Sequence, residues 1–452
     1  MTTSSSTEFG PLAVCVLAAG KGTRMRSARP KVLQPLAGAP LLEHVLRAVA
    51  GAAGRLAVRP LVVPIIGYEA EQVRALLESP EIVGLGLDLD PVVQEPQLGT
   101  GHAVQVASRA FSGLVGQTPP ARVLVLLGDV PLIRAETLEG LFEEHARSGA
   151  AATILTTRVP DPAGYGRVVR AADGDVERIV EHKDALAAGD SAVLAIDEIN
   201  TGIFVFDLDP LQEALPALSN ENQSNEYYLP DVLPRLQQAG HRVAAVVAAQ
   251  PAEVAGVNDL IQLAEAEAAV RQRILFAHMR AGVRIVDPTT TYIEVGVEIG
   301  PETTILPFTV IRRGVRIGQS CEVGPFSHLR VGTQLRDTAE IGNFVETKKA
   351  DVGPHSKAKH LAYLGDVSLG EGVNVGAGTV FANYDGKNKH QTRVEDGVFI
   401  GSGSMIVAPR VIERDAKTGA GSVVTKDVPA GVTVIGVPAR PFRSAKRSEK
   451  PE

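Results

Sequence analysis

The sequence lacks tryptophan and has only two cysteines, Cys15 and Cys321, among its 452 residues. Two cysteines cannot build a disulfide framework, and neither has a neighbour typical of a metal site, so we expect both to be buried apolar residues in a reducing compartment. No apolar run reaches membrane-spanning length, and the start, MTTSSSTEFG, lacks a signal-peptide pattern. We therefore expect a cytoplasmic protein without a membrane span.

An excess of positive charge is also lacking. The 45 basic residues stand against 52 acidic ones, which gives a formal net charge of −7. Because nucleic-acid binding favours a basic surface, this balance argues against nucleic acid as a partner. A chain of 452 residues is too long for a single core, so two domains are expected.

Up to about residue 256, apolar runs alternate with helical patterns. Strand-like runs include LAVCVL from Leu12 and RVLVLL from Arg122, and helices are expected over residues 41–53 and 69–77. This alternation predicts a Rossmann-like α/β domain over residues 1–256. Its mostly parallel sheet should be covered on both faces and should bind ligands at the carboxyl ends of the strands.

The first of these runs leads directly into LAAGKGTRM, residues 17–25, which is followed by Pro30 and Lys31. Gly20 and Gly22 can take backbone conformations closed to other residues, so main-chain N–H groups could face a phosphate. A glycine pair after a strand is also compatible with a simple tight turn. The added charge of Arg24 and Lys31 favours a phosphate loop, although the spacing is neither a dinucleotide fingerprint nor a Walker A loop.

This segment resembles the signature of sugar-nucleotide pyrophosphorylases, which join a nucleoside triphosphate to a sugar 1-phosphate. Five further strings match the uridylyltransferases of that family: VQEPQLGTGHA (93–103), LGDVPL (127–132), GYGR (164–167), VEHKD (180–184) and EINTG (198–202). The resemblance implies a nucleotide- and sugar-binding set of Leu17, Ala18, Ala19, Gly20, Arg24, Lys31, Gln94, Gly99, Thr100, Leu127, Gly128, Asp129, Gly166, Glu181, Asn200 and Asn258. Within it, Gln94 would pair with a uracil edge, since an amide accepts and donates at once.

Asp129 ends a buried strand, where an unpaired carboxylate is costly and a metal ion would relieve the cost. Magnesium usually takes one or two carboxylates together with phosphate oxygens. Asn258 alone would be interpreted as a helix cap. The resemblance makes Asp129 and Asn258 the Mg²⁺ ligands and UTP the nucleotide substrate.

A linker helix rich in alanine and glutamate is expected over residues 257–282. Beyond it, an aliphatic residue followed by glycine recurs, for instance at Ile299–Gly300 and Ile317–Gly318, with spacings that are mostly multiples of six. Hexapeptides of this type predict a parallel β-helix over 283–440, in which three hexapeptides make one coil. The charged tail, 441–452, is expected to be disordered.

Two segments interrupt this repeat. FANYDGKNKHQTRV, residues 381–394, should leave the coil as a loop, and residues 345–366 should be less regular. A β-helix that served only as a stalk would need no polar residues there. The pattern resembles left-handed β-helix acyltransferases, whose trimers place active sites between neighbouring coils.

His360 is the candidate catalytic base, because histidine titrates near neutral pH and N-acetylation requires a proton to leave an amine. Over roughly residues 10–440 the chain is similar to the family of bifunctional uridylyltransferase/acetyltransferase enzymes. This similarity assigns substrate and acetyl-CoA binding to Arg330, Lys348, Tyr363, Asn374, Ala377, Asn383, Tyr384, Ser402, Ala420 and Arg440. Arg440 is assigned although Val437 takes the apparent place of the family's last CoA-binding arginine.

The resemblance implies an enzyme of UDP-N-acetylglucosamine biosynthesis that feeds peptidoglycan and lipopolysaccharide precursors. It would acetylate glucosamine 1-phosphate with acetyl-CoA, transfer UMP from UTP to N-acetylglucosamine 1-phosphate, and form a homotrimer. One alternative is a pyrophosphorylase for another nucleotide or sugar, which would leave the polar residues of the β-helix unused. Another is a non-catalytic regulator like the translation exchange factors, which would be free to lose Lys31, Asp129 or His360.

Overall fold

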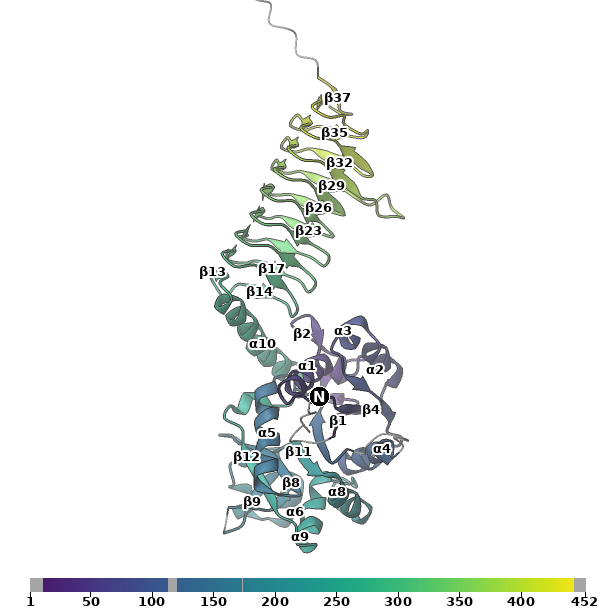
Figure 1. The fold of residues 1–452 in the computed structure, drawn as a ribbon, viewed down its shortest axis with the longest axis vertical. Coiled ribbons are helices and arrows are strands. Elements are labelled where there is room, and N and C mark those ends of the chain that lie inside the picture. The colour runs from purple at the N-terminus through teal and green to yellow at the C-terminus, as the bar shows by residue number, and fades with distance from the viewer. Residues whose placement is uncertain (1–10, 113–119, 173, 443–452) are drawn as a thin grey trace, which may run out of the picture. The chain divides into compact units, whose positions relative to one another are not determined.

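The computed structural model describes residues 11–112, 120–172 and 174–442 (Figure 1). The chain divides into two compact units, Met1–Glu267 and Ala268–Glu452. Cys15 and Cys321 are both buried and free. Within the described ranges, no helix is long and apolar enough to cross a membrane. The tail expected to be disordered lies outside the described residues from 443 onward.

The first unit is built on a ten-stranded sheet. Its main path runs β10 (Val176–Val180), β9 (Arg167–Arg170), β11 (Glu198–Asp207), β7 (Arg122–Leu127), β1 (Leu12–Ala18), β4 (Leu61–Ile66) and β5 (Asp88–Leu89). Strand β6 (Val92–Val93) pairs with β4, β8 (Ala152–Arg158) with β11, and β12 (Val243–Val247) with β8. β1 is parallel to both β4 and β7, as predicted, whereas β11 runs antiparallel to β7 and β8.

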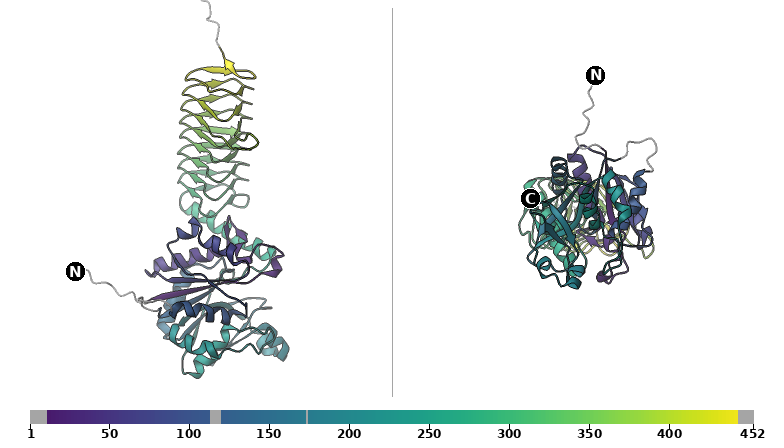
Figure 2. Two further views of the ribbon diagram at one scale, coloured as in Figure 1. Left: turned by 90° about the vertical axis from the view of Figure 1, so that its right-hand side faces the viewer. Right: turned by 90° about the horizontal axis from the view of Figure 1, so that it is seen from below.

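Helices cover both faces of this sheet (Figure 2). They are α1 (Leu41–Arg55), α2 (Ala70–Leu77), α3 (Pro80–Val83), α4 (Thr100–Ser112), α5 (Ala135–Ser148), α6 (His182–Ala188), α7 (Ser191–Leu194), α8 (Leu208–Ala214) and α9 (Val232–Gln238), and a hairpin of β2 (Pro35–Leu36) and β3 (Ala39–Pro40) precedes α1. Because side chains alternate along a strand, Val14 packs in one core with Val45 of α1, and Cys15 packs in another with Val104 of α4. The prediction of a sheet covered on both faces is confirmed.

Helix α10 (Leu260–Arg280) forms within the range expected for the linker. Its first turn is capped by Asp259, whose Oδ1 accepts hydrogen bonds from the backbone N–H of Ile261 and Gln262, both at 2.9 Å. Asp259 therefore does the capping that the sequence also allowed for Asn258.

The second unit is a parallel β-helix whose coils contribute strands to three sheets (Figure 1). Sheet I contains β13 (Arg284–Ile285), β16 (Thr304–Ile305), β19 (Glu322–Val323), β22 (Glu340–Asn343), β25 (Lys357–His360), β28 (Asn374–Val375), β31 (Phe399–Ile400), β34 (Lys417–Thr418), β36 (Thr433–Ile435) and β37 (Arg440–Pro441). Sheet II contains β14 (Tyr292–Ile293), β17 (Val310–Ile311), β20 (His328–Leu329), β23 (Glu346–Lys348), β26 (Tyr363–Gly365), β29 (Val380–Ala382), β32 (Met405–Val407) and β35 (Val423–Val424). Sheet III contains β15 (Glu298–Ile299), β18 (Arg316–Ile317), β21 (Gln334–Leu335), β24 (Asp351–Val352), β27 (Val367–Leu369), β30 (Thr392–Val394) and β33 (Arg410–Ile412).

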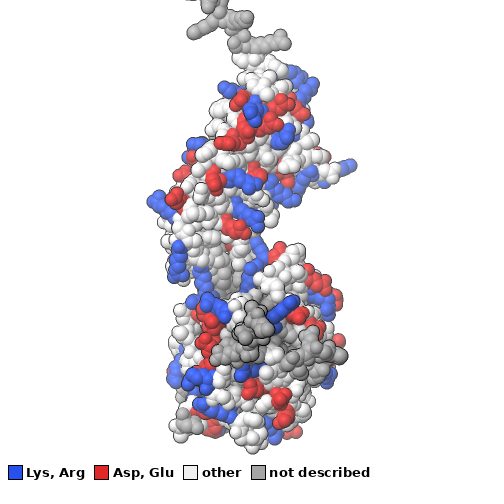
Figure 3. All heavy atoms as spheres, viewed as in Figure 1, with Lys and Arg blue, Asp and Glu red and all other residues white. Residues whose placement is uncertain are grey.

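The parallel β-helix was predicted, and one aliphatic core built from Ile, Val and Leu runs through its coils. We call the turn from sheet I to sheet II the first corner and the turn from sheet II to sheet III the second corner. On the face that Figure 3 shows, basic and acidic side chains are interspersed along the β-helix. The left hand predicted for the coil stays a prediction.

The segment 345–366 is more regular than expected. His328 pairs with Glu346 on the next coil, and Glu346 pairs in turn with Tyr363 on the coil after that. The step from Glu346 to Tyr363 is one residue shorter than the step from His328 to Glu346. The missing residue is lost at the second corner, since β24 starts five residues after β23 starts, while β21 starts six after β20. These coils therefore depart from the repeat, as expected, but only by one residue each, and their strands pair as regularly as in the other coils.

The expected loop leaves the β-helix at the same second corner. Val367 of β27 pairs with Thr392 of β30, which is a longer step along the chain than in the preceding coils, so the insertion lies between β29 and β30. Asp385 closes the loop on itself, because its Oδ1 accepts from the N–H of Lys387 and Asn388 and its Oδ2 lies 2.7 Å from Nε2 of His390. We call residues 383–391 the insertion loop.

Candidate functional site

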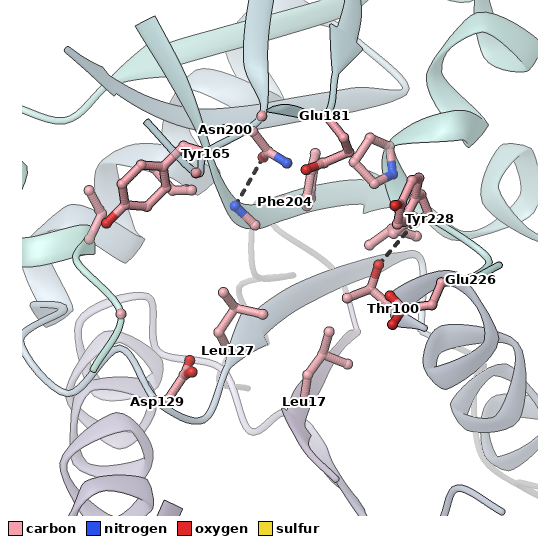
Figure 4. Close-up of a pocket in the computed structure, with 18 of the residues that line it drawn as sticks. Leu17, Thr100, Leu127, Asp129, Tyr165, Glu181, Asn200, Phe204, Glu226 and Tyr228 are labelled. Atoms are coloured by element: carbon pink, nitrogen blue, oxygen red, sulfur yellow. Dashed lines mark hydrogen bonds between the residues drawn. The ribbon is translucent and has the colours of Figure 1, made fainter. Parts of the chain in front are cut away.

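A cavity of about 320 Å³ opens in the first unit where β1 and β7 end (Figure 4). Eight of the predicted residues line it: Leu17, Thr100, Leu127, Asp129, Gly166, Glu181, Asn200 and Asn258. The other predicted residues of this site, Ala18, Ala19, Gly20, Arg24, Lys31, Gln94, Gly99 and Gly128, are not among the residues that line the cavity. The position agrees with the rule that open α/β sheets bind ligands at the carboxyl ends of their strands.

Two cationic side chains converge on the carboxamide of Asn258. The Nζ atom of Lys31 and the Nη2 atom of Arg24 each donate to Oδ1 of Asn258 at 3.0 Å. Lys31 also forms an ion pair with Asp129, and both side chains are largely buried, with 14% and 16% of their surface exposed. The backbone N–H of Val257 donates to the carbonyl of Asp129 at 2.8 Å, which ties the segment before α10 to the end of β7. One cluster thus contains two cations, one carboxylate and one amide oxygen.

Of the two glycines expected to shape the loop, only Gly22 has a special conformation. Its φ is +65°, and a Cβ atom there would lie 2.5 Å from Cβ of Lys31. Glycine is thus needed both for the turn and for the close approach of Lys31. Gly20 has no positive φ, and a Cβ there would meet nothing within 4 Å, so the expectation that Gly20 uses its freedom is not met.

The loop after β6 is attached to a segment that the sequence did not single out. The Nε2 atom of Gln94 donates to the carbonyl of Gly99 at 2.9 Å, and Gln94 itself is buried. The hydroxyl of Thr100 accepts from the N–H of Leu229 at 3.0 Å, and the N–H of Tyr227 donates to the carbonyl of Leu98 at 2.8 Å. Residues 226–230 therefore form a wall of the site.

Glu226 and Tyr228 in that wall, together with Tyr165, line the cavity but were absent from the predicted set (Figure 4). The available signal was the polar string SNEYYLPD, residues 224–231, in a region of otherwise apolar periodicity. Because no pattern links this string to a particular ligand, sequence reasoning gave it no role.

Glu181 is the carboxylate on the opposite side of the cavity from Asp129 (Figure 4). Burial raises its pKa, and the nearby Asp184, Asp231 and Glu226 raise it further, while the Arg167 guanidinium acts in the opposite direction. Asn200 is fixed in its turn, since its Oδ1 accepts from the N–H of Gly202 at 2.9 Å. A carboxyl group whose proton is held more tightly than usual can donate as well as accept a hydrogen bond.

In the β-helix, the predicted acetyltransferase residues fall into two groups. His360, Ala377, Ser402 and Ala420 lie at the first corner, whereas Arg330, Lys348, Asn383 and Tyr384 lie at the second. The remaining three lie on strands: Tyr363 begins β26, Asn374 begins β28 and Arg440 begins β37. A single chain therefore does not bring all of these residues together.

The first-corner group forms a backbone column. The N–H of Gly403 donates to the carbonyl of Ala377 at 2.7 Å, and the N–H of Gly421 donates to that of Ser402 at 2.8 Å. The N–H of Gly378 reaches the carbonyl of His360 at 3.4 Å. The His360 side chain is exposed beside this column.

The second-corner group surrounds a lysine. Lys348 is 11% exposed, and its Nζ lies 3.9 Å from Oδ2 of Asp366, which also accepts from Nδ2 of Asn383. Lys389 of the insertion loop is the largest cause that lowers the pKa of Lys348, and burial adds to it, while Asp366 opposes it. Neither Asp366 nor Lys389 was in the predicted set, because no sequence pattern shows that these residues lie beside Lys348.

Known proteins match both units. Residues 14–193 match the MobA-like NTP transferase domain family. The protein named "Bifunctional protein GlmU" from Syntrophotalea carbinolica is 46% identical over 461 residues, covering 94% of this chain and 94% of the relative. The proteins of the same name from Shouchella clausii and Streptomyces coelicolor are 43% and 42% identical, covering 92% and 94% of this chain and 94% and 92% of their own lengths.

The chain belongs to the bifunctional GlmU family. The resemblance to bifunctional enzymes is confirmed, because the similarity to GlmU proteins extends through the β-helix as well as the nucleotidyltransferase unit. A pyrophosphorylase that merely carries a β-helix does not account for this match.

Proposed function

We propose that the chain is a bifunctional enzyme with one reaction in each unit. The first unit, about residues 1–256, joins UTP and N-acetylglucosamine 1-phosphate to give UDP-N-acetylglucosamine and pyrophosphate. After the linker helix, 257–282, the β-helix over 283–440 acetylates glucosamine 1-phosphate with acetyl-CoA. The observation that carries this proposal is the cluster of Arg24, Lys31, Asp129 and Asn258 at a cavity of a GlmU-family chain.

The donor atoms in this cluster fit a magnesium ion. Asp129 offers a carboxylate and Asn258 an amide oxygen, both in contact with the same ammonium of Lys31. Their oxygens therefore already face one positively charged position. Magnesium is commonly bound through few protein oxygens plus substrate phosphates. When bound, it would neutralise charge on the triphosphate.

The residues of this chain would act mainly by positioning and by covering charge, as phosphoryl-type transfer requires. Arg24 and Lys31 bind the phosphates of UTP, and Gln94 pairs with the uracil edge. Gly166, Glu181 and Asn200 hold the sugar. A phosphate oxygen of N-acetylglucosamine 1-phosphate attacks the α-phosphorus, the bond to the β-phosphate breaks, and pyrophosphate leaves.

His360 is the proposed base of the second reaction. The amine of glucosamine 1-phosphate attacks the thioester carbonyl, its proton passes to His360, and the carbon–sulfur bond breaks to release coenzyme A. Histidine suits this step because its unperturbed pKa lies near neutral pH. Arg330 and Lys348 bind the sugar phosphate, Tyr363 and Asn374 help hold the sugar, and Ala377, Asn383, Tyr384, Ser402, Ala420 and Arg440 contact acetyl-CoA.

A homotrimer would complete this second site. The first corner carries a ladder of large apolar side chains, Phe308, Phe326, Phe344 and Leu361, which are 51%, 46%, 57% and 61% exposed. The phenyl rings stack with centroids 4.7 and 5.3 Å apart. A contiguous exposed apolar surface of this kind is typical of a protein interface. The ladder runs up to His360, so a second copy covering it could bring its own second corner to that histidine.

A coupled assay tests the proposal, in which glucosamine 1-phosphate, acetyl-CoA and UTP are supplied to the full chain in a reducing, cytoplasm-like buffer. We expect UDP-N-acetylglucosamine, free coenzyme A and pyrophosphate in equal amounts. Omitting acetyl-CoA should abolish product, and supplying N-acetylglucosamine 1-phosphate should restore it. The proposal would be overturned if glucosamine 1-phosphate were not acetylated and N-acetylglucosamine 1-phosphate were not converted to UDP-N-acetylglucosamine.

A further inference from the structure

The second corner of the shortened coils brings two side chains, those of Lys348 and Asn383, to one carboxylate, that of Asp366. Oδ2 of Asp366 lies 3.9 Å from Nζ of Lys348 and accepts a hydrogen bond from Nδ2 of Asn383. The backbone of Asp366 adds two hydrogen bonds, because its N–H donates to the carbonyl of Lys348 at 2.9 Å and its carbonyl accepts from the N–H of Thr392 at 3.1 Å. Asp366 thus connects the coil of Lys348 to Asn383, the first residue of the insertion loop, and to Thr392 of β30, which follows the loop.

Neither side chain of this ion pair is on the open surface. Asp366 is 14% exposed and Lys348 11% exposed. Such a pair is screened less by water than a surface ion pair, and removing one partner leaves the other charge poorly compensated. Asp366 is therefore a nearby carboxylate that offsets, in part, the influences that lower the pKa of Lys348.

We propose that Asp366 is a positioning residue of the acetyltransferase site, which keeps Lys348 charged and aligned for the sugar phosphate and ties the insertion loop to it through Asn383. This inference rests on the proposed acetyl transfer. Asp366 acts through Lys348 and Asn383 and need not touch the substrate.

The charges that face Lys348 explain why a carboxylate is required. Lys389 comes from the insertion loop and Arg330 from the preceding coil, and both lower the pKa of Lys348, as does burial. Arg330 has its own partner, since its Nη1 lies 2.7 Å from Oε1 of Glu346. Asp366 acts in the opposite direction. Without it, Lys348 would lose its proton at a lower pH and would bind a phosphate less well.

Asp366→Asn is a suitable test because the backbone at this position has a φ of +47°. Asparagine tolerates this left-handed conformation at least as well as aspartate, and its amide is nearly the same size. The substitution therefore removes the charge with little cost to the turn. Asp351→Asn is the matched control, because Asp351 is an exposed carboxylate of an adjacent strand that pairs with Arg336.

The measurement is acetyl transfer by the full chain, with glucosamine 1-phosphate varied at saturating acetyl-CoA from about pH 7 to 10. For Asp366→Asn we expect the KM for glucosamine 1-phosphate to rise about tenfold, as for the loss of one partner of a buried pair. The KM for acetyl-CoA should change little. The decrease of kcat/KM at alkaline pH should begin at a lower pH than in the wild type. The control Asp351→Asn should have wild-type values of both KM and the same decrease of kcat/KM at alkaline pH.

A second substitution separates this role from a merely structural one. Lys389→Gln removes the largest influence that lowers the pKa of Lys348. When Lys389→Gln is combined with Asp366→Asn, the pH at which kcat/KM begins to decrease should rise again towards the wild-type value. In Lys389→Gln alone, this pH should be higher than in the wild type. If Asp366 had only a structural role, its substitution would lower kcat at every pH, and the pH at which kcat/KM begins to decrease would not change in any of these variants.

Each outcome has a distinct meaning. An unchanged decrease of kcat/KM at alkaline pH in Asp366→Asn, with uridylyl transfer intact, would overturn the inference. If Asp366→Asn does not fold, an unchanged decrease in Lys389→Gln alone would overturn it. A wild-type chain that acetylates no glucosamine 1-phosphate would instead contradict the proposed function itself.

Discussion

His360 and Lys348 lie at different corners of the β-helix, His360 at the end of a strand of sheet I and Lys348 at the end of a strand of sheet II. One side of the coil, sheet II, lies between the two corners. If both residues serve one reaction, as proposed, each active site must combine the first corner of one copy with the second corner of another. This geometry makes the shared site directly testable.

Mixing two inactive variants should restore acetyl transfer. In a cyclic trimer assembled from equal amounts of His360→Ala and Lys348→Ala chains, about a quarter of the sites would combine an intact His360 with an intact Lys348. We therefore expect about a quarter of the wild-type activity after the two variants are dissociated together and reassociated, against almost none for either alone. No recovery, in a mixture shown to exchange subunits, would place the site within one chain.

His360→Ala alone should lower the kcat of acetyl transfer about 10²–10⁴-fold, which is the usual effect of losing a general base. Uridylyl transfer should not change because its site is in the other unit, and the oligomeric state should not change because the substitution leaves the apolar ladder of the first corner intact. The matched control is His355→Ala, another exposed histidine of the β-helix, whose imidazole contacts Thr338. Acetylation within a few-fold of wild type would show that another group or water takes the proton.

Asp129→Ala should abolish uridylyl transfer and leave acetyl transfer intact. It removes the carboxylate proposed to bind magnesium and the partner of Lys31. Asp90→Asn is the control, since Asp90 is an exposed carboxylate of the same unit. Full uridylyl activity of Asp129→Ala over a range of magnesium concentrations would contradict the metal assignment.

The fold could be predicted because its signals are local. The LAVCVL run became β1, and the amphipathic pattern over 41–53 became α1 (Leu41–Arg55). The glycine periodicity gave the β-helix, since each hexapeptide forms one side of a coil. The loss of one residue at the second corner could not be recognised, because the polar side chains there mask the repeat.

Much of the candidate site depends on contacts between distant parts of the chain. Lys31 and Asp129 are far apart in sequence, and their pairing follows only from the adjacency of β1 and β7. Sequence reasoning placed a metal at Asp129 to compensate its charge and did not anticipate that Lys31 contacts it. Tyr228 was missed for a similar reason, since only the packed fold places its segment against the loop after β6.

The raised pKa of Glu181 predicts a pH-dependent stability. Because the folded chain holds this proton to a higher pH than the unfolded chain, the folded state loses stability as the pH rises above the unfolded value. Glu181→Gln should therefore unfold at a higher temperature than wild type near pH 8, and the difference should vanish at about pH 3, where the glutamate is protonated in both states. Thermal denaturation at both pH values tests this, with the exposed Glu177→Gln as control. A lower melting temperature of Glu181→Gln at pH 8 would contradict the prediction.

Gly99→Ala should impair uridylyl transfer by displacing residues 226–230 or the loop after β6, because it removes no side chain that takes part in the reaction. Gly99 has a φ of +102°, and a Cβ atom there would lie 2.7 Å from the carbonyl oxygen of Tyr227. Relieving this contact must move either the loop after β6 or residues 226–230, at a cost of roughly 1–3 kcal/mol for the strained backbone. We expect the KM values for UTP and for N-acetylglucosamine 1-phosphate to rise about tenfold, with acetyl transfer unchanged. Gly140→Ala in α5, where a Cβ atom would meet nothing within 4 Å, should leave both KM values unaltered. Wild-type KM values for Gly99→Ala would show that this contact does not shape the site.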